Sequence, residues 1–318
     1  MPKTNLMSLA KTIKTEADAY SYMESLRWPN GPICPHCGSM EKHYFLKPKG
    51  GTDARKTRTG NMTERRVWKC KTCRKQFSVI TGTVFHGSKV PLHTWLMVVF
   101  EMCSNKNGIA AREIERKYGV APKTAWFMTH RLREAMRRKA PGALIGPVIV
   151  DETWFGGDPK NRHGHKSGGK KGRTEKTPIV ALIDTATGEV RSQAVPTVTG
   201  ETLRQVIAEH TPLANATLYT DSSLAYRTVT PTVAEHQTVN HNVGEYVRGN
   251  VSVNRAENFF SQLKRSIDGT HHHISKAHLH RYLTEFDFRY STRDMSDAAR
   301  MGRLMGQVGG RRLAYRTV

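Results

Sequence analysis

PVIVDETWFGG, residues 147–157, is an apolar run that leads into two adjacent acids and ends in two glycines. Val148, Ile149 and Val150 predict a buried strand, because a short run of β-branched residues is typical of a strand covered on both faces. Asp151 follows at the edge of this strand. Taken alone, an acid at such a place is more often a solvated strand end than a catalytic group.

Two later stretches each supply another acid. In ATLYTDSSLAY, residues 216–226, a second short strand ends at Asp221. In NRAENFFSQLKR, residues 254–265, apolar residues recur at helical spacing, and this spacing places Glu257 and Lys264 on one helix face. The sequence therefore predicts two acids at strand ends and a third on a helix.

These three acids predict a metal-dependent active site. Three carboxylates brought together repel one another unless divalent cations lie between them. Oxygen ligands with open coordination positions suit Mg²⁺ or Mn²⁺. Two such ions roughly 3.5–4 Å apart can activate an attacking oxygen and stabilise a leaving oxygen in phosphoryl transfer. We therefore expect nuclease or strand-transfer chemistry, with two Mg²⁺ or Mn²⁺ ions held by Asp151, Asp221 and Glu257.

The charge of the chain indicates a polyanionic partner. Its 50 Lys and Arg residues and 27 Asp and Glu residues give a formal net charge of +23 at pH 7. Contacts to phosphates release counterions, so nucleic acid is the expected partner and a membrane surface is the weaker alternative. The longest apolar run, residues 95–103, is too short to span a membrane. The amino terminus lacks the apolar segment of a signal peptide, so we expect a cytoplasmic, nucleoid-associated bacterial protein without membrane contact.

Four of the five cysteines form two CxxC pairs, CPHC and CKTC. Each pair presents two thiolates from one tight turn, and four thiolates complete a tetrahedral structural zinc site. In a reducing compartment this pattern favours metal over disulfides. We expect one structural Zn²⁺ ion, bound by Cys34, Cys37, Cys70 and Cys73.

Residues 91–140 are predicted to be helical. An amphipathic helix over residues 110–118 is followed by the turn Gly119-Val120-Ala121 and by a longer basic helix over residues 122–138. This order is typical of a helix-turn-helix, although helical hairpins that do not touch DNA share it. The net charge and the neighbouring zinc module favour DNA binding, with contacts from Lys123, Thr124 and Arg131.

Residues 156–173 are rich in glycine and in basic side chains, a composition too polar to pack alone. The segment reads either as a disordered loop or as a mobile basic loop that holds a phosphate backbone beside the metal site. In the second interpretation the contacts come from Lys160, Arg162, Lys170, Lys171 and Arg173.

The elements predicted after residue 141 follow the order of an RNase H-like mixed sheet: strand, hairpin, helix, strand and helix. The expected fold class is multidomain α+β, with a zinc ribbon, a helix-turn-helix region and an RNase H-like mixed α/β catalytic domain. The expected boundaries are 1–33 for an N-terminal helical segment, 34–90 for the zinc ribbon, 91–140 for the helix-turn-helix region, 141–293 for the catalytic domain and 294–318 for a basic C-terminal tail.

Several motifs in one order make the chain similar to a known family along nearly its whole length. They are LRWPNGPICPHCGS, CKTCRKQFSVITGTVF, VDETWFGG, LYTDSSLAY, HNVGEYVRG and NRAENFFSQLKRSIDGTHHHISKAHLHRYLTEFDFRYSTR. The chain resembles DDE transposases of the IS1595 (ISXO2-like) insertion-sequence family. The resemblance implies the three domains named above, a catalytic triad of Asp151, Asp221 and Glu257, and a contact from Lys264 to transposon-end DNA. One departure is Ser252, where relatives commonly have His.

The expected function is that of a DNA transposase, which cleaves DNA at transposon ends and transfers the freed strand into target DNA by a two-metal mechanism. Pairing of two ends implies a homo-oligomer, a dimer or larger. Two alternatives remain. A domesticated or inactive relative would be a sequence-specific DNA-binding regulator, although the intact acids argue against this. An RNase H-like nuclease or resolvase would share the acids but would not need the amino-terminal modules.

Overall fold

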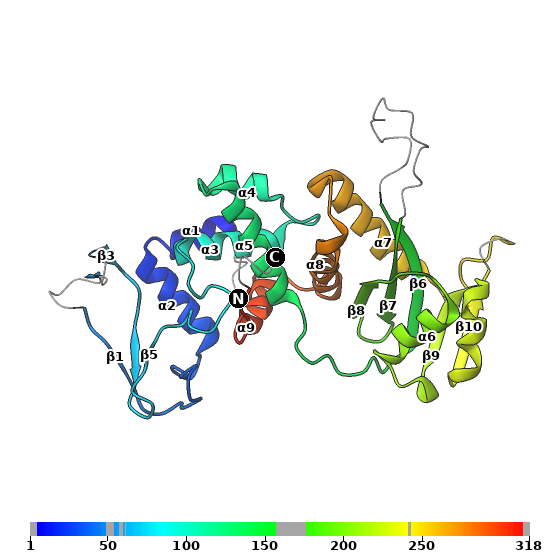
Figure 1. Ribbon diagram of the computed structural model, residues 1–318, viewed down its shortest axis with the longest axis horizontal. Helices are drawn as coiled ribbons and strands as arrows, with labels where there is room; N and C mark the ends of the chain where they lie inside the picture. The colour runs from blue at the N-terminus through cyan, green and yellow to red at the C-terminus, as the bar shows by residue number, and fades with distance from the viewer. Residues whose placement is uncertain are drawn as a thin grey trace. The chain divides into compact units, whose positions relative to one another are not determined.

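The computed structural model describes residues 5–48, 54–56, 60, 62–156, 176–240 and 243–313. The chain divides into two units (Figure 1). Unit 1 is discontinuous and comprises residues 1–138 and 294–318, whereas unit 2 is the continuous segment 139–293. None of the described helices is long and apolar enough to cross a membrane.

The amino-terminal part of unit 1 contains very short strands. In its described residues one antiparallel sheet has the order β1-β4-β5, and β2 pairs with β3 in a separate ribbon. Phe77 is buried and meets the rings of Trp28 and His43 edge-on, so an aromatic cluster holds the sheet against the end of α2. The strands are β1 (His43–Phe45), β2 (Arg55–Lys56), β3 (Met62–Thr63), β4 (Trp68–Cys70) and β5 (Gln76–Phe77).

The helices of unit 1 pack around α3 (Leu92–Ser104). Most of its residues are buried, because it is apolar on nearly every side, as expected of a core helix. It contacts α1, α2 and α9, while α4 packs against α5. The bounds of these helices are α1 (Leu6–Thr12), α2 (Glu16–Arg27), α4 (Ala111–Tyr118), α5 (Pro122–Met136) and α9 (Asp297–Gln307).

The carboxyl-terminal helix α9, which lies in the segment expected to be a basic tail, belongs to the core of unit 1. Met301, Leu304 and Met305 are buried, and α9 contacts α2, α3 and α5. Arg300 donates a hydrogen bond to the backbone carbonyl of Cys103 in α3. Beyond α9, Arg311 donates to the backbone carbonyls of two residues at the end of α5. Arg300 and Arg311 therefore stabilise the fold of unit 1.

In the described part of unit 2, five strands form one mixed sheet of order β10-β9-β6-β7-β8. β6 is antiparallel to β7, and β7 is antiparallel to β8, whereas β9 runs parallel to both β6 and β10. The strands are β6 (Val148–Phe155), β7 (Thr177–Asp184), β8 (Val190–Ala194), β9 (Thr217–Asp221) and β10 (Glu235–Val239).

Both faces of this sheet are covered. Side chains alternate along a strand, so Ile149 packs into one hydrophobic cluster and its neighbours Val148 and Val150 pack into the other. The cluster with Ile149 includes α7 (Asn254–Ser266) and α8 (Leu279–Ser291), and the opposite cluster includes α6 (Gly200–Ala208). Burial on both faces explains the continuous apolar run that predicted β6.

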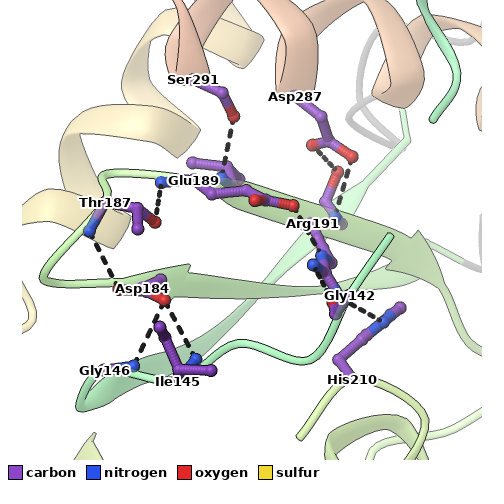
Figure 2. Close-up of polar contacts among 12 residues, drawn as sticks. Gly142, Ile145, Gly146, Asp184, Thr187, Glu189, Arg191, His210, Asp287 and Ser291 are labelled. Atoms are coloured by element: carbon purple, nitrogen blue, oxygen red, sulfur yellow. Dashed lines mark hydrogen bonds and ion pairs between the residues drawn. The ribbon is translucent and has the colours of Figure 1, made fainter. Parts of the chain in front are cut away.

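Side chains of α8 hydrogen-bond to backbone groups of the edge strand β8. The helix lies beside this strand in Figure 1. Ser291 Oγ accepts the backbone N–H of Val190 at 2.9 Å, and Asp287 accepts both the N–H and the hydroxyl of Ser192, at 3.0 and 2.6 Å (Figure 2). Asp287 and Ser291 are four residues apart and share one helix face. They satisfy edge groups that would otherwise be open to pairing with another strand.

Asp184, at the end of β7, organises both the β7–β8 turn and the segment that leads into β6. Its carboxylate accepts the N–H group of Ala186 at 2.8 Å. It also accepts the N–H group of Thr187 at 3.0 Å and those of Ile145 and Gly146 at 3.3 Å (Figure 2). Burial alone would raise the pKa of Asp184, but these four hydrogen bonds hold it below its ordinary value.

We expect Asp287 to make the stability of the protein depend on pH. Burial raises its pKa to about 8, although the hydrogen bonds from Ser192 act in the opposite direction. The unfolded chain ionises Asp near pH 4, so between about pH 4 and 8 unfolding releases a proton. The free energy of unfolding should therefore fall with rising pH across this window, by up to about 1.4 kcal/mol per pH unit.

Urea unfolding of the wild type and of Asp287→Asn across this pH range measures the effect. The Asn side chain keeps the volume of Asp and can still accept the Ser192 N–H, so the variant should fold. Its free energy of unfolding should no longer fall with rising pH by the amount that Asp287 contributes. Asp184→Asn is the matched control. The pKa of Asp184 is lowered, so its contribution to the free energy of unfolding is lost only in acid, and its replacement should leave the fall in stability toward pH 8 in place. An unchanged slope in Asp287→Asn would contradict the prediction.

Candidate active site and metal centre

The four cysteines predicted to bind zinc lie together in unit 1. The Sγ atoms of Cys34 and Cys73 are 3.7 Å apart, as are those of Cys37 and Cys70, and all four lie within 4.8 Å of one another. Zn–S bonds of about 2.3 Å in tetrahedral geometry require sulfur separations close to these values. Among the described residues, this group is the one whose ligand atoms converge enough to hold a metal ion. The arrangement supports a structural Zn²⁺ ion.

Asp151 lies within β6 and not at its end, contrary to the expectation from the sequence. β6 continues to Phe155 because its second half remains paired with β7. Pairing between β6 and β9, however, stops at Ile149. Asp151 therefore occupies the place where these two parallel strands separate.

The register of the sheet aligns Asp151 with Asp221. Val148 lies opposite Leu218, and Ile149 opposite Tyr219, so continuing this register brings Asp151 level with Asp221 at the end of β9. Ile149 and Tyr219 both pack on the α7 side of the sheet. Because side chains alternate along a strand, the two acids two residues further on face the same side.

Glu257 lies in the first turn of α7, the helix that covers this side of the sheet. The pKa of Asp151 is raised to about 7, first by burial and then by the charges of Glu152, Asp221 and Glu257. Asp221 and Glu257 are therefore close enough to Asp151 to act on it electrostatically, but the carboxylate oxygens of the three acids do not converge as closely as the four cysteine sulfurs do. Asp221 itself is held by the N–H of Ser223, which donates to its Oδ1 at 3.0 Å.

Sequence reasoning missed Glu152, which lies next to Asp151 but on the opposite face of the sheet. Tyr226, which is 1% exposed, donates a hydrogen bond from its hydroxyl to Glu152 Oε2 at 2.6 Å. The pKa of Glu152 is raised by burial, while this hydrogen bond lowers it and the charge of Asp221 raises it. The alternation of the predicted strand could have placed Glu152 on the reverse face, but only the fold brings Tyr226 to it.

The predicted DNA contacts differ in exposure. Lys123, in the first turn of α5, and Lys264, in the last turn of α7, are exposed, and Thr124 is partly exposed. Arg131 is buried, with its guanidinium 4.7 Å from the ring centre of Phe127. The other predicted contacts, Lys160, Arg162, Lys170, Lys171 and Arg173, lie outside the described residues.

A cleft of about 1080 Å³ in unit 1 was not predicted. It lies between the β2–β3 ribbon and the starts of α2 and α3, and its basic lining residues are Lys14, Arg55, Lys56, Arg65 and Lys89. Glu16 accepts two N–H groups at the start of α3, at 2.7 and 2.9 Å, and Glu64 accepts one at the start of α2, at 3.0 Å. Helix amino termini thus offset the negative charge of both acids of the cleft. The lysines that line the cleft are exposed.

Comparison with known proteins gives two family matches. Residues 143–291 match the ISXO2-like transposase domain, and residues 14–76 match the transposase zinc-ribbon domain, both of the IS1595 group. The chain belongs to the IS1595 transposase family. The family expected from the sequence motifs is therefore confirmed, and so is the coarser fold: a mixed α/β chain with a zinc-ribbon cysteine cluster.

Two individual proteins are also similar to this IS1595-family chain. An uncharacterized protein in transposable element ISH50 of Halobacterium salinarum is 28% identical over 289 residues, which are 88% of this chain and 92% of that protein. A chain of the simian T-cell lymphotropic virus intasome, solved by cryo-EM in complex with PP2A regulatory subunit B56 gamma, is 12% identical with a TM-score of 0.31. That likeness covers 61% of this chain and 65%, less than two thirds, of the viral complex's chain.

Proposed function

We propose that this IS1595-family chain cleaves DNA at the ends of its own element and joins the freed 3′ ends to target DNA. The chemistry would take place on unit 2, an RNase H-like catalytic domain, with two Mg²⁺ or Mn²⁺ ions held by Asp151, Asp221 and Glu257. The observation that carries the proposal is the register that aligns Asp151 with Asp221, on the face of the sheet covered by the helix bearing Glu257.

The donor set suits hard divalent cations. All three side chains offer carboxylate oxygens, the ligands that Mg²⁺ and Mn²⁺ prefer. The raised pKa of Asp151 means that burial and the neighbouring negative charges disfavour its ionised form, and a bound cation would relieve this cost. When bound, two such ions supply Lewis-acid stabilisation to the attacking and leaving oxygens of a phosphodiester.

The protein's own side chains would hold the DNA in line for this reaction. Lys264 is exposed on the same helix as Glu257 and seven residues after it, so it can neutralise a phosphate next to the acids. The segment with Lys160, Arg162, Lys170, Lys171 and Arg173 follows β6 in the chain, and we propose the same role for it. Pairing two element ends requires at least two copies of the chain.

Unit 1 would recognise the DNA. α4 ends at Tyr118 and is capped by Gly119, whose backbone is left-handed with φ 62°, and the short turn leads directly into α5. This supports the helix-turn-helix proposal, with Lys123 and Thr124 at the amino terminus of the second helix as contacts. Because Arg131 is buried against Phe127, it would position this helix and not reach the DNA.

The lysines of the cleft in unit 1 are expected to contact phosphates. Each phosphate contact contributes about 0.9 to the slope of log binding constant against log salt concentration. Replacing Lys14, Lys56 and Lys89 together with Gln should therefore reduce this slope by about 2.7 if each of the three makes one such contact. Fluorescence anisotropy with end DNA at several salt concentrations measures it. Lys11→Gln, an exposed lysine of α1 outside the cleft lining, is the matched control, and an unchanged slope in the triple variant would exclude the cleft from binding.

The proposed function is tested by incubating the zinc-loaded protein with DNA that carries its element's flanking ends, with Mg²⁺ or Mn²⁺. We expect cleavage at the ends and joined products with target DNA. Specific binding of the ends without any cleavage in either metal would instead identify a DNA-binding regulator. Cleavage of branched DNA or RNA hybrids, without preference for the ends, would identify a nuclease or resolvase.

A further inference from the structure

The reverse side of the sheet carries a hydrogen-bonded link between the two aligned acids. Glu152 follows Asp151 in β6 and faces the α6 side, where Tyr226 of η3 (Leu224–Thr228) donates to its carboxylate at 2.6 Å. Glu152 is therefore on the wrong face to be a fourth metal ligand, since alternate residues of a strand face opposite sides.

Each end of this link leads directly to one of the acids. On the β6 side, the N–H of Glu152 donates to Asp151 Oδ1 at 2.8 Å. On the η3 side, the N–H of Tyr226 donates to the carbonyl of Ser223 at 3.2 Å, and the N–H of Ser223 donates to Asp221 Oδ1 at 3.0 Å. Four hydrogen bonds, joined by the covalent bonds of Glu152, Tyr226 and Ser223, thus connect one acid to the other.

The Tyr226 side chain is itself held firmly. It is buried beside His236, with ring centres 6.1 Å apart, and the two nitrogens of His236 hydrogen-bond to the hydroxyls of Thr220 and Thr230, each at 2.8 Å. Burial raises the pKa of Tyr226 well above its ordinary value, so its hydroxyl keeps its proton and remains a donor.

The link lies where the backbone ladder does not hold the acids together. β6 and β9 pair at Val148 and Ile149 and then separate, so Asp151 and Asp221 lie just beyond the last paired residues. There β6 is held by β7 and β9 is held by β10, each on its outer side. A cross-link from η3 to β6 restrains the two strands relative to each other at the level of the acids.

We propose that Tyr226 and Glu152 are positioning residues that set the separation of Asp151 and Asp221, and thereby the affinity of the site for its divalent cations. This inference rests on the proposed function, because it takes the two acids as metal ligands. Neither Tyr226 nor Glu152 contacts the cations in this proposal.

The test compares the full-length, zinc-loaded wild type with Tyr226→Phe, which keeps the ring and removes the hydroxyl. Free Mn²⁺ is titrated by electron paramagnetic resonance without DNA, and the Mn²⁺ dependence of end cleavage is measured in parallel. We expect the Mn²⁺ dissociation constant to rise on the order of tenfold, the effect typical of losing one good hydrogen bond. Half-maximal cleavage should need correspondingly more Mn²⁺, while the rate at saturating Mn²⁺ recovers to within about threefold of the wild type, because a filled site restores the geometry.

Four further variants separate positioning from a general structural role. Glu152→Gln keeps an acceptor for the Tyr226 hydroxyl and should bind Mn²⁺ nearly as the wild type does. Glu152→Ala should weaken Mn²⁺ binding as Tyr226→Phe does. The double variant, Tyr226→Phe with Glu152→Ala, should bind Mn²⁺ no more weakly than either single variant, because each substitution removes the same hydrogen bond. Tyr118→Phe is the matched control, since it removes a similar bond in unit 1, from the hydroxyl to Glu101 Oε1 at 2.8 Å, and should leave Mn²⁺ binding unchanged.

The outcomes distinguish this inference from the proposed function. Wild-type Mn²⁺ affinity in Tyr226→Phe and in Glu152→Ala would overturn the inference and leave the proposed active site standing. A lower cleavage rate that added Mn²⁺ does not restore would show a merely structural role and would also overturn it. Mn²⁺ binding that persists unchanged in Asp221→Asn would refute the active site itself, and the inference with it.

Discussion

Replacement of Asp151 or Asp221 by Asn is expected to abolish DNA cleavage and joining, with a fall in rate of about 10³-fold or more, while binding of element ends stays within about threefold of the wild type. Asn keeps the shape of the side chain but removes the charge that a divalent cation requires. Because Asp151 is partly buried and its ionised form is disfavoured, Asp151→Asn should be no less stable than the wild type in thermal unfolding.

Denaturing gels of labelled end DNA measure the products, and anisotropy measures binding of the same DNA. Glu235→Gln is the matched control: this exposed acid is the first residue of β10, at the opposite end of that strand from the register of Asp221, and its loss should leave cleavage intact. Cleavage that persists in either Asn variant would remove that acid from the catalytic site.

Loss of zinc is expected to unfold the amino-terminal sheet and to abolish binding of element ends. The strands β1, β4 and β5 have three, three and two residues, too few for a stable sheet without a further cross-link. Structural zinc contributes apparent binding free energies on the order of 10 kcal/mol to such modules. Cys70→Ser removes a ligand at a buried position, so the variant should lose both the ion and the protection of β4 and β5 from hydrogen exchange.

Unit 2 should be unaffected, and protection of β6 and β7 from hydrogen exchange should match that of the wild type in the same sample. Cys103→Ala is the matched control, because Cys103 lies buried in α3 and outside the four-cysteine group; it should retain one zinc ion per chain. Full zinc content and normal end binding in Cys70→Ser would contradict a four-cysteine site.

The features that could be predicted from sequence are those encoded by neighbouring residues. A CxxC pair presents two thiolates whatever surrounds it, so the zinc ligands are readable from spacing alone. The β-branched run of β6 and the helical spacing around Glu257 similarly point to their elements. The sequence predicts Asp151 at a strand end because the apolar run stops there, and only the pairing with β7 shows that the strand continues.

The features that could not be predicted depend on register and on packing between distant segments. The contact of Tyr226 with Glu152 joins residues that are far apart in the chain, and it exists only because β6 and β9 are neighbours in the sheet. Arg131 has the charge of a DNA contact, and its burial depends on how α5 packs. The lysine-lined cleft combines α2, the ribbon and the start of α3, a combination that no local pattern contains.

The placement of α9 in unit 1 has a consequence for how the protein is made. Synthesis proceeds from the amino terminus, and domains generally fold as units when their residues have left the ribosome. All of unit 2, residues 139–293, precedes α9, so this continuous segment can fold while unit 1 still lacks a helix of its core. The nascent chain would therefore hold a folded unit 2 before unit 1 is complete. Premature termination just before α9 would release a protein with the proposed acids in place and without a finished unit 1.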